Sequence, residues 1–392
     1  MIIKTSKSTM YDSAKTITTF DSLKRGIEKH GDTIIVSERN NIGDNISTPK
    51  PDAYYQVNTL KQKHFNEDLQ SNDHYLIWKS QLPFLVGETA SFRTTKNPHT
   101  YNRLGWYSYQ WGEGRFGAKN CDRDRWNKFV NDTKVKFRDW RDTGDNIVIL
   151  LQKPGDSSLN ALESTKDVVV KRAYLEWVAT LIVNIRKYTD RPIVIRPHPK
   201  FTRYKYNWDM LYHVLGMNLD LVEFLDPSIL TNLPRRKKYH ERYFQENLGK
   251  DSSKKCKGSE SYHMTLLGFK IKGVTISDRS LKEDLKNAHC VVTYNSLSSV
   301  EAAQAGVPII SLNEGCMTHP IAHHNLEDIE DLRYDIDITQ WQNDIAYTQW
   351  NEEENASGES WEHLKPLIKT KRPELSSDLV VKKIKEIYVG AI

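Results

Sequence analysis

The sequence predicts an α/β protein made of two doubly wound domains, each built around a mostly parallel sheet. Length is the first observation, because 392 residues are too many for one ordinary domain and suit two. The second is a β-loop-α-β order over residues 1–36. The third is an apolar run at 146–152, which begins a further β-α-β-α-β series that ends near residue 312.

The first domain is expected to span residues 1–145. Its predicted strands are Met1–Ser6, Thr33–Val36, Asp73–Lys79 and Pro83–Glu88. Ile17–Lys29 has apolar side chains at helical spacing, and Gly31 is placed to end that helix. Residues 93–141 show no clean period and predict long loops rich in basic and aromatic residues, with a short helix near 124–131.

The second domain is expected to span residues 146–340. Its predicted strands are Asn146–Gln152, Pro192–Arg196, Gly273–Ile276, Cys290–Tyr294 and Pro308–Leu312. Its predicted helices are Val168–Tyr188, Leu281–Asn287 and Ser298–Ala305. Residues 341–392 are expected to be C-terminal helices that cross back to the first domain.

Composition narrows the class of protein. No run approaches the length of a membrane span, and residues 1–5 lack the plan of a signal peptide, so we expect a cytoplasmic protein without a membrane span. The 4 cysteines are widely spaced and form no CxxC pair, which argues against a disulfide framework or a zinc site. The net charge of +5 permits a polyanionic partner without requiring one. The oligomeric state is not predicted.

The strongest chemical signal lies in residues 291–310, where a buried strand ends in a run of hydroxyl side chains that opens a helix. Backbone N–H groups at such a helix start attract phosphate, and Ser296, Ser298 and Ser299 are candidate donors to it. Glu301 is placed to accept hydrogen bonds from a ribose diol. The alternative is a purely structural helix start with a capping-box glutamate.

Two further motifs follow earlier strands of the same half. Arg196-Pro197-His198-Pro199 offers a cation and a hydrogen-bond donor, and the loop after Gln152 offers Asp156, Ser157 and Ser158. Ligands of doubly wound sheets bind at the carboxyl ends of strands, and all three motifs are expected there. A histidine between two prolines is also compatible with a plain strand end.

These three motifs, over residues 146–312, resemble the donor site of GT-B glycosyltransferases, in the branch of the capsule-polysaccharide transferases. The resemblance implies a GT-B fold, with two Rossmann-like doubly wound domains facing a cleft, and a nucleotide-sugar donor, taken as a UDP-sugar. It implies that His198 faces the donor phosphates. Over residues 1–145 it extends to topology alone.

A metal is not expected to be essential, and no cofactor other than the donor is expected. Arg196 and His198 would stabilise the departing diphosphate, which is what a metal-independent transferase needs. The triplet Asp122-Arg123-Asp124 has Asp-x-Asp spacing, but it lies in the basic loop region and does not follow a strand of the donor half.

The general base that deprotonates an acceptor hydroxyl is expected in the first half. Glu88 is the first candidate, because it closes a predicted strand and precedes a loop. Asp12, in the first loop, is the second. A structural salt bridge explains Glu88 equally well.

The acceptor region is expected within residues 93–141, where basic residues alternate with aromatic ones. The candidate acceptor-binding residues are Arg93, Arg103, Trp106, Trp111 and Arg115, with a second basic run at Arg235, Arg236, Lys237 and Lys238. Basic and aromatic side chains fit DNA with an extruded base. Aromatic rings also pack on sugars, or form an ordinary core with solvated charges around it.

Three hypotheses of function follow. The favoured one is a phage-type glycosyltransferase that modifies a hydroxymethylated base (5-hydroxymethylcytosine type) in DNA. The alternative is a transferase acting on a capsular or cell-surface glycan. The third is a non-catalytic protein that binds nucleotides or nucleic acid.

Overall fold

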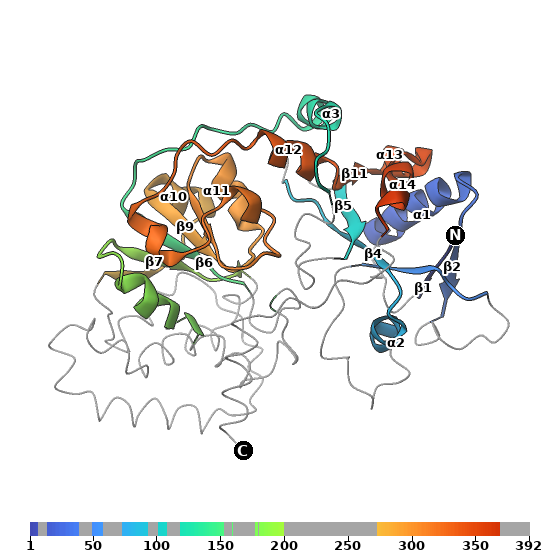
Figure 1. The fold of residues 1–392 in the computed structure, drawn as a ribbon, viewed down its shortest axis with the longest axis horizontal. Helices are drawn as coiled ribbons and strands as arrows, with labels where there is room; N and C mark the ends of the chain where they lie inside the picture. The colour runs from blue at the N-terminus through green and yellow to red at the C-terminus, as the bar shows by residue number, and fades with distance from the viewer. Residues whose placement is uncertain are drawn as a thin grey trace, which may run out of the picture. The chain divides into compact units, whose positions relative to one another are not determined.

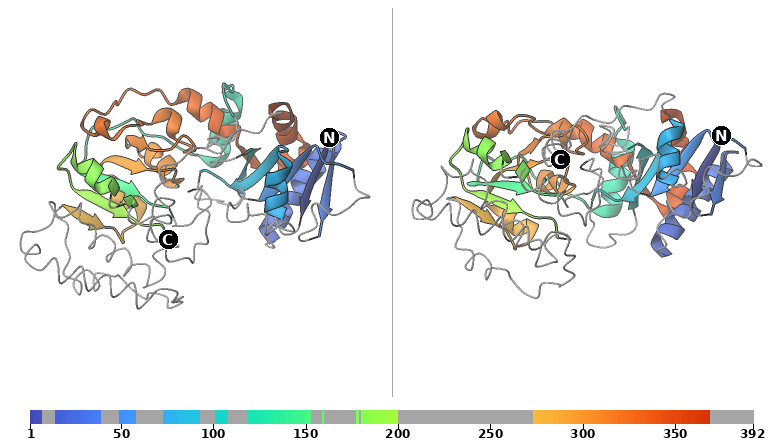
Figure 2. Two further views of the ribbon diagram at one scale, coloured as in Figure 1. Left: turned by 60° about the horizontal axis from the view of Figure 1, so that its bottom comes forward. Right: turned by 90° about the horizontal axis from the view of Figure 1, so that it is seen from below.

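The structure is a computed structural model, and it divides into two compact units. The residues that it describes are 1–6, 14–38, 49–57, 73–92, 101–107, 118–152, 159, 177–178, 180–199 and 273–368. Unit 1 comprises Met1–Phe137, Glu314–Ile321 and Asp337–Ser376, and unit 2 comprises Arg138–Asn313, Ala322–Ile336 and Ser377–Ile392. Each unit holds one sheet flanked by helices (Figures 1 and 2). The predicted two-domain α/β class is confirmed.

Unit 1 contains a six-stranded sheet in the order β11-β5-β4-β3-β1-β2. Its strands are β1 (Ile2–Ser6), β2 (Thr33–Ser37), β3 (Ala53–Val57), β4 (Phe84–Thr89), β5 (Tyr101–Trp106) and β11 (Gln349–Asn351). Strands β2, β1, β3 and β4 are parallel to one another. Strand β5 is antiparallel to β4, and β11 is antiparallel to β5. Strands buried on both faces need apolar residues throughout, and β4 opens with buried Phe84, Leu85 and Val86.

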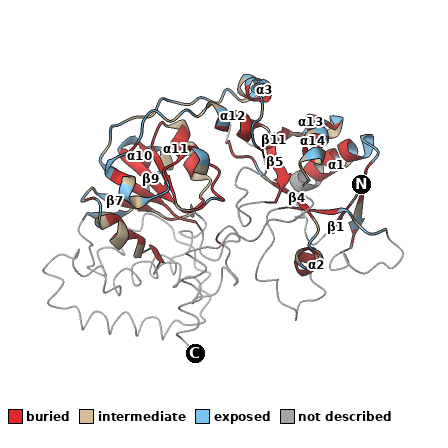
Figure 3. Cartoon of the chain, in the orientation of Figure 1, coloured by how far each residue is buried: buried red, intermediate tan, exposed pale blue. Residues whose placement is uncertain are grey.

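The helices of unit 1 come from both ends of its sequence. They are α1 (Ala14–Lys29), α2 (Asp73–Ser80), α3 (Asp124–Thr133), α12 (Thr339–Ala346), α13 (Glu352–Ser357) and α14 (Glu359–Leu364). A Cβ on Gly26 of α1 would lie 1.9 Å from the backbone oxygen of Asn355, so α1 and α13 pack backbone to backbone. Trp361 of α14 donates to Asp32 at 2.7 Å. The buried faces of these helices are visible in Figure 3.

Unit 2 contains a five-stranded, wholly parallel sheet in the order β10-β9-β6-β7-β8. Its strands are β6 (Asn146–Leu150), β7 (Ile193–Arg196), β8 (Val274–Ile276), β9 (Ala288–Thr293) and β10 (Ile309–Ser311). Its named helices are α10 (Leu281–Lys286) and α11 (Ser298–Gln304). Residues 177–178 and 180–186 are also helical. Among the described helices, none is long and apolar enough to cross a membrane.

Four segments of unit 1 differ from the sequence prediction, and the first is β3 (Ala53–Val57), a strand that was not predicted. Asp73–Ser80 is the helix α2 and not a strand, with Asp73 in its first turn, where a carboxylate is favourable. Tyr101–Trp106 is a strand inside a region predicted as loops. Gln349–Asn351 is a strand inside a region predicted as helical. The missed strands β5 and β11 pair with each other, so each depends on a partner that is far away in the sequence.

Gly306 after α11 is expected to be intolerant of a side chain. It has φ +71°, and a Cβ there would lie 2.1 Å from the backbone oxygen of Asp139. Gly273 has a similar φ of +69°, but its Cβ would meet only the flexible tip of Arg186. We expect Gly273→Ala to lose about 1–2 kcal/mol of unfolding free energy. Gly306→Ala should lose about twice that or more, because the Asp139 backbone must also move. Denaturant unfolding of both variants checks this, and equal losses would contradict it.

Candidate functional site

The sheet of unit 2 has its topological switch point between β6 and β9. From β6 the chain proceeds outward to β7 and β8, and it then returns to the other side of β6 for β9 and β10. Because all five strands are parallel, their carboxyl ends share one edge. In such sheets the crevice at the switch point is where ligands bind. The residues after β6 and β9 therefore define the candidate site.

Gln152 connects the two strand ends at this switch point. With its amide carbonyl turned toward the loop after β9, it accepts from the backbone N–H groups of Asn295 (2.8 Å) and Ser296 (2.7 Å). The Ser296 N–H also lies 3.1 Å from the hydroxyl of Thr293. Two N–H groups expected to face a phosphate are thus used inside the protein. Among the described residues, the Leu297 N–H has no hydrogen-bond acceptor.

The start of α11 presents Ser298 and Glu301 at the surface of unit 2. Both are partly exposed, whereas Ser299 is fully buried. The N-cap residue Leu297 makes no side-chain cap, so Glu301 does not form a capping box, and the Ser298 N–H donates to Ser296 Oγ at 3.4 Å. Within the described part of the chain, the Glu301 carboxylate has no hydrogen bond or ion pair. The Ser298 hydroxyl and the Glu301 carboxylate are therefore accessible to a nucleotide, whereas the buried Ser299 hydroxyl is not.

Arg196, at the carboxyl end of β7, is held by a buried carboxylate. Its Nη1 lies 2.7 Å from Asp284 Oδ2 and donates to the backbone oxygen of Arg279 at 2.6 Å. Asp284 is buried, and it also accepts from Ser277 Oγ at 2.6 Å and pairs with Arg279 at 3.0 Å. Because Asp284 is shared between Arg196 and Arg279, this group keeps a net positive charge, and the expectation that Arg196 binds the donor diphosphate stays a prediction. His198, two residues further on, is half-buried.

Most of the other predicted site residues lie outside the described residues. These are Asp12, Arg93, Trp111, Arg115, Asp156, Ser157, Ser158, Arg235, Arg236, Lys237 and Lys238.

Glu88 and Arg103 face each other across β4 and β5 in unit 1. Arg103 Nη2 lies 2.6 Å from Glu88 Oε2, and Arg103 is 2% exposed. Its other nitrogens donate to the backbone oxygen of Thr89 (2.8 Å) and to Met317 Sδ (2.9 Å). The prediction that Arg103 contacts an acceptor is corrected, because its guanidinium is buried and bonded within unit 1.

Trp106 is likewise a core residue. Its ring is 1% exposed, lies 6.2 Å from that of Trp361, and donates its indole N–H to the backbone oxygen of Leu364 at 2.7 Å. The proposed stacking of Trp106 on an acceptor is therefore corrected, since the ring has no face available to a ligand.

The sheet of unit 1 has its own switch point, between β1 and β3. Ser6, at the end of β1, donates its hydroxyl to the carboxylate of Asp73 at the start of α2. Asp73 and the adjacent His74 are both buried. Sequence reasoning missed this acid–histidine pair because it took the segment for a strand. An aspartate before an apolar helical period was the signal that would have found it.

The solved structures that are similar to this chain include two transferases and an epimerase. The β-Kdo 2,4-transferase KpsC of Thermosulfurimonas dismutans is 11% identical, with 98% of each chain covered and a TM-score of 0.42. The β-Kdo 2,7-transferase KpsC of the same organism is 13% identical, with 93% of this chain and 100% of that one covered and a TM-score of 0.44. The UDP-GlcNAc 2-epimerase of Methanocaldococcus jannaschii, in complex with UDP-GlcNAc and UDP, is 12% identical, with 99% of each chain covered and a TM-score of 0.23.

No protein-family model matches the sequence, and no curated protein sequence does. None of the structural similarities assigns a role to a particular residue of this chain.

Proposed function

We propose that this protein is a glycosyltransferase that binds a nucleotide-sugar donor at the carboxyl edge of the unit 2 sheet. The observation that carries the proposal is the position of the switch point. Of the three motifs that predicted a donor site, two directly follow β6 and β9, the strands that border the crevice, and the third follows the adjacent β7.

The proposed donor contacts are divided among four residues. Glu301 accepts hydrogen bonds from the ribose diol, which its uncommitted carboxylate suits. Ser298 and the N–H of Leu297 donate to the diphosphate at the start of α11. His198 donates to the same phosphates and stabilises the leaving diphosphate. Arg196, held at the end of β7 by Asp284, adds positive charge beside these phosphates.

For the acceptor we propose a hydroxyl group of a glycan. The burial of Arg103 and Trp106 removes two of the residues on which a DNA acceptor was predicted. A hydroxymethylated DNA base is the second candidate, and the exposed Lys134, Lys136 and Arg138 favour it. Incubating the protein with a panel of nucleotide sugars and each acceptor, followed by mass spectrometry of the products, separates the two.

Donor binding should depend on Glu301 and His198. Glu301→Ala and His198→Ala are each expected to lose a charge-assisted hydrogen bond worth about 1.5–3 kcal/mol. The dissociation constant for the nucleotide should therefore increase roughly 10- to 150-fold. Isothermal titration calorimetry with UDP, CMP, GDP and their sugars measures this. The matched controls are Glu327→Ala and His324→Ala, exposed residues of unit 2 away from α11 and β7.

The controls should bind nucleotide like the unmodified protein, and circular dichroism should show all four variants folded. If Glu301→Ala and His198→Ala both keep full nucleotide affinity, the assignment of the donor site is wrong.

A further inference from the structure

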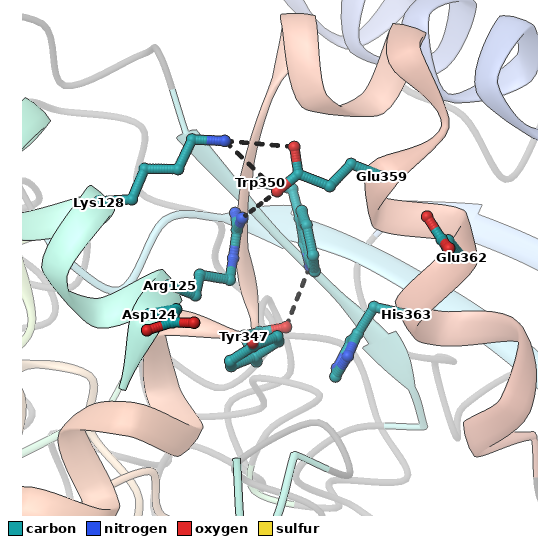
Figure 4. A pocket seen from close by; sticks show the side chains of 8 residues that line it. All are labelled: Asp124, Arg125, Lys128, Tyr347, Trp350, Glu359, Glu362 and His363. Atoms are coloured by element: carbon teal, nitrogen blue, oxygen red, sulfur yellow. Dashed lines mark hydrogen bonds and ion pairs between the residues drawn. The ribbon is translucent and has the colours of Figure 1, made fainter. Parts of the chain in front are cut away.

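Unit 1 contains a pocket that the proposed transfer reaction does not use. It lies between α3, the segment around β11, and α14 (Figure 4), and its volume is about 320 Å³. That is at the lower end of the range for small-molecule sites. Every residue that lines it belongs to unit 1.

The two basic residues of the pocket are already neutralised. Arg125 lies 2.8 Å from Glu354 and 3.3 Å from Glu359. Lys128 lies 2.9 Å from Glu354 and 3.2 Å from Glu359. Two cations and two carboxylates thus form a closed, balanced group. The pocket therefore has no excess positive charge with which to hold an anion.

Two other carboxylates at the pocket are not balanced. Asp124 comes from the first turn of α3 and Glu362 from α14, on two sides of the pocket (Figure 4). Within the part of the chain that the structure describes, neither carboxylate has a hydrogen bond or an ion pair. Asp122 adds a third negative charge nearby, and it accepts from the Tyr347 hydroxyl at 2.9 Å. The rim is therefore negative.

The wall between these two carboxylates is aromatic. The ring centroids of Tyr347 and His363 lie 4.5 Å apart, and those of Trp350 and His363 lie 5.7 Å apart. Burial, together with the positive charge of Arg125, lowers the pKa of His363 to about 4. His363 is therefore neutral near pH 7. Its buried Nε2 has no hydrogen-bond partner among the described residues.

We propose that this pocket binds a small aliphatic diamine or polyamine, whose ammonium groups pair with Asp124 and Glu362 while its methylene chain lies against the partly exposed Tyr347 and His363. Ammonium groups form charge-assisted hydrogen bonds with carboxylates and are attracted to aromatic faces. The two separated carboxylates match a ligand with two cationic ends. The inference is independent of the proposed transferase activity.

The test compares a dication with a neutral molecule of the same length. Isothermal titration calorimetry on the full chain, with cadaverine (1,5-diaminopentane), should show saturable binding at one site. 1,5-Pentanediol should not bind. The double variant Asp124→Asn/Glu362→Gln should weaken cadaverine binding by about tenfold or more, because both ion pairs are lost.

Glu353→Gln is the matched control. It removes one negative charge from an exposed position of unit 1 that does not line the pocket, and it should leave cadaverine binding unchanged. Equal binding of pentanediol would identify a site for neutral polyols and overturn the proposal. An equal effect of Glu353→Gln would show unspecific attraction, and absence of binding up to about 10 mM cadaverine would show that no amine site exists.

Discussion

Arg125→Met is expected to destabilise unit 1 by about 3–5 kcal/mol, because it removes the buried partner of Glu354 and leaves this interior carboxylate paired only with the half-exposed Lys128 among the described residues. Both side chains are buried, and the Arg125 guanidinium also covers the Trp350 ring, with Cζ 3.4 Å from the ring centroid. It donates as well to the backbone oxygens of Ala346 and Gln349. One residue of α3 thus connects α12, β11 and α13. Differential scanning calorimetry and denaturant unfolding measure the loss.

Lys128→Met is the matched control, since Lys128 pairs with the same two glutamates but is half-exposed. It should lose about 1 kcal/mol or less. The double variant Arg125→Met/Glu354→Met should recover much of the stability, because apolar replacement of a whole buried pair is close to neutral. If Arg125→Met loses no more than Lys128→Met, the buried pair is not what connects these elements.

The contribution of the Arg125–Glu354 pair to the free energy of unfolding should depend on pH. Burial alone would raise the pKa of Glu354, but its hydrogen bonds and charge interactions with Arg125, together with those of Lys128, lower it below its usual value. A carboxylate whose pKa is lower in the folded state stabilises the fold above its unfolded pKa, and it loses this contribution as the pH falls. The difference between Arg125→Met and the unmodified protein should therefore shrink in acid.

The parallel sheet of unit 2 was predictable because its strands carry their own signal. Residues 147–150 are buried on both faces and form an uninterrupted apolar run. The strands β5 and β11 carry no such signal. Gln349 pairs with Arg103 across more than half of the chain, so the pairing that makes them strands depends on the complete fold.

The position of the candidate donor site could be predicted from the sequence, but the hydrogen bonds and ion pairs within it could not. Strand order in a parallel sheet places the residues after β6, β7 and β9 at one edge, wherever the rest of the chain lies. The partner of Arg196 is Asp284, which lies 88 residues away, and no local pattern indicates that contact. Nor does a pattern indicate that Gln152 takes up two N–H groups of the loop after β9. A helix start alone therefore does not predict a phosphate site reliably. One side chain from elsewhere in the chain, here Gln152, decides which backbone N–H groups are left to bind a ligand.

Glu88→Gln is expected to reduce glycosyl transfer by about 100-fold or more if Glu88 deprotonates the acceptor hydroxyl. The amide keeps the shape of the side chain and removes its basicity. Glu88 is the next-to-last residue of β4, and its side chain is 12% exposed, so a substrate has limited access to it. Donor affinity should stay unchanged, because the proposed donor contacts belong to unit 2. Steady-state kinetics and nucleotide titration together measure both quantities.

The ion pair with Arg103 gives Glu88 a second role that the experiment must separate from the first. If Glu88 serves only to hold the buried guanidinium, Glu88→Gln should lower the melting temperature and leave the turnover of the folded protein near normal. Glu28→Gln, at an exposed position of α1, controls for the loss of one negative charge. Normal turnover in Glu88→Gln would exclude it as the base. The next candidates would be Asp73, which accepts from Ser6 at the switch point of the same sheet, the adjacent His74, and Asp12, which follows β1 in the sequence.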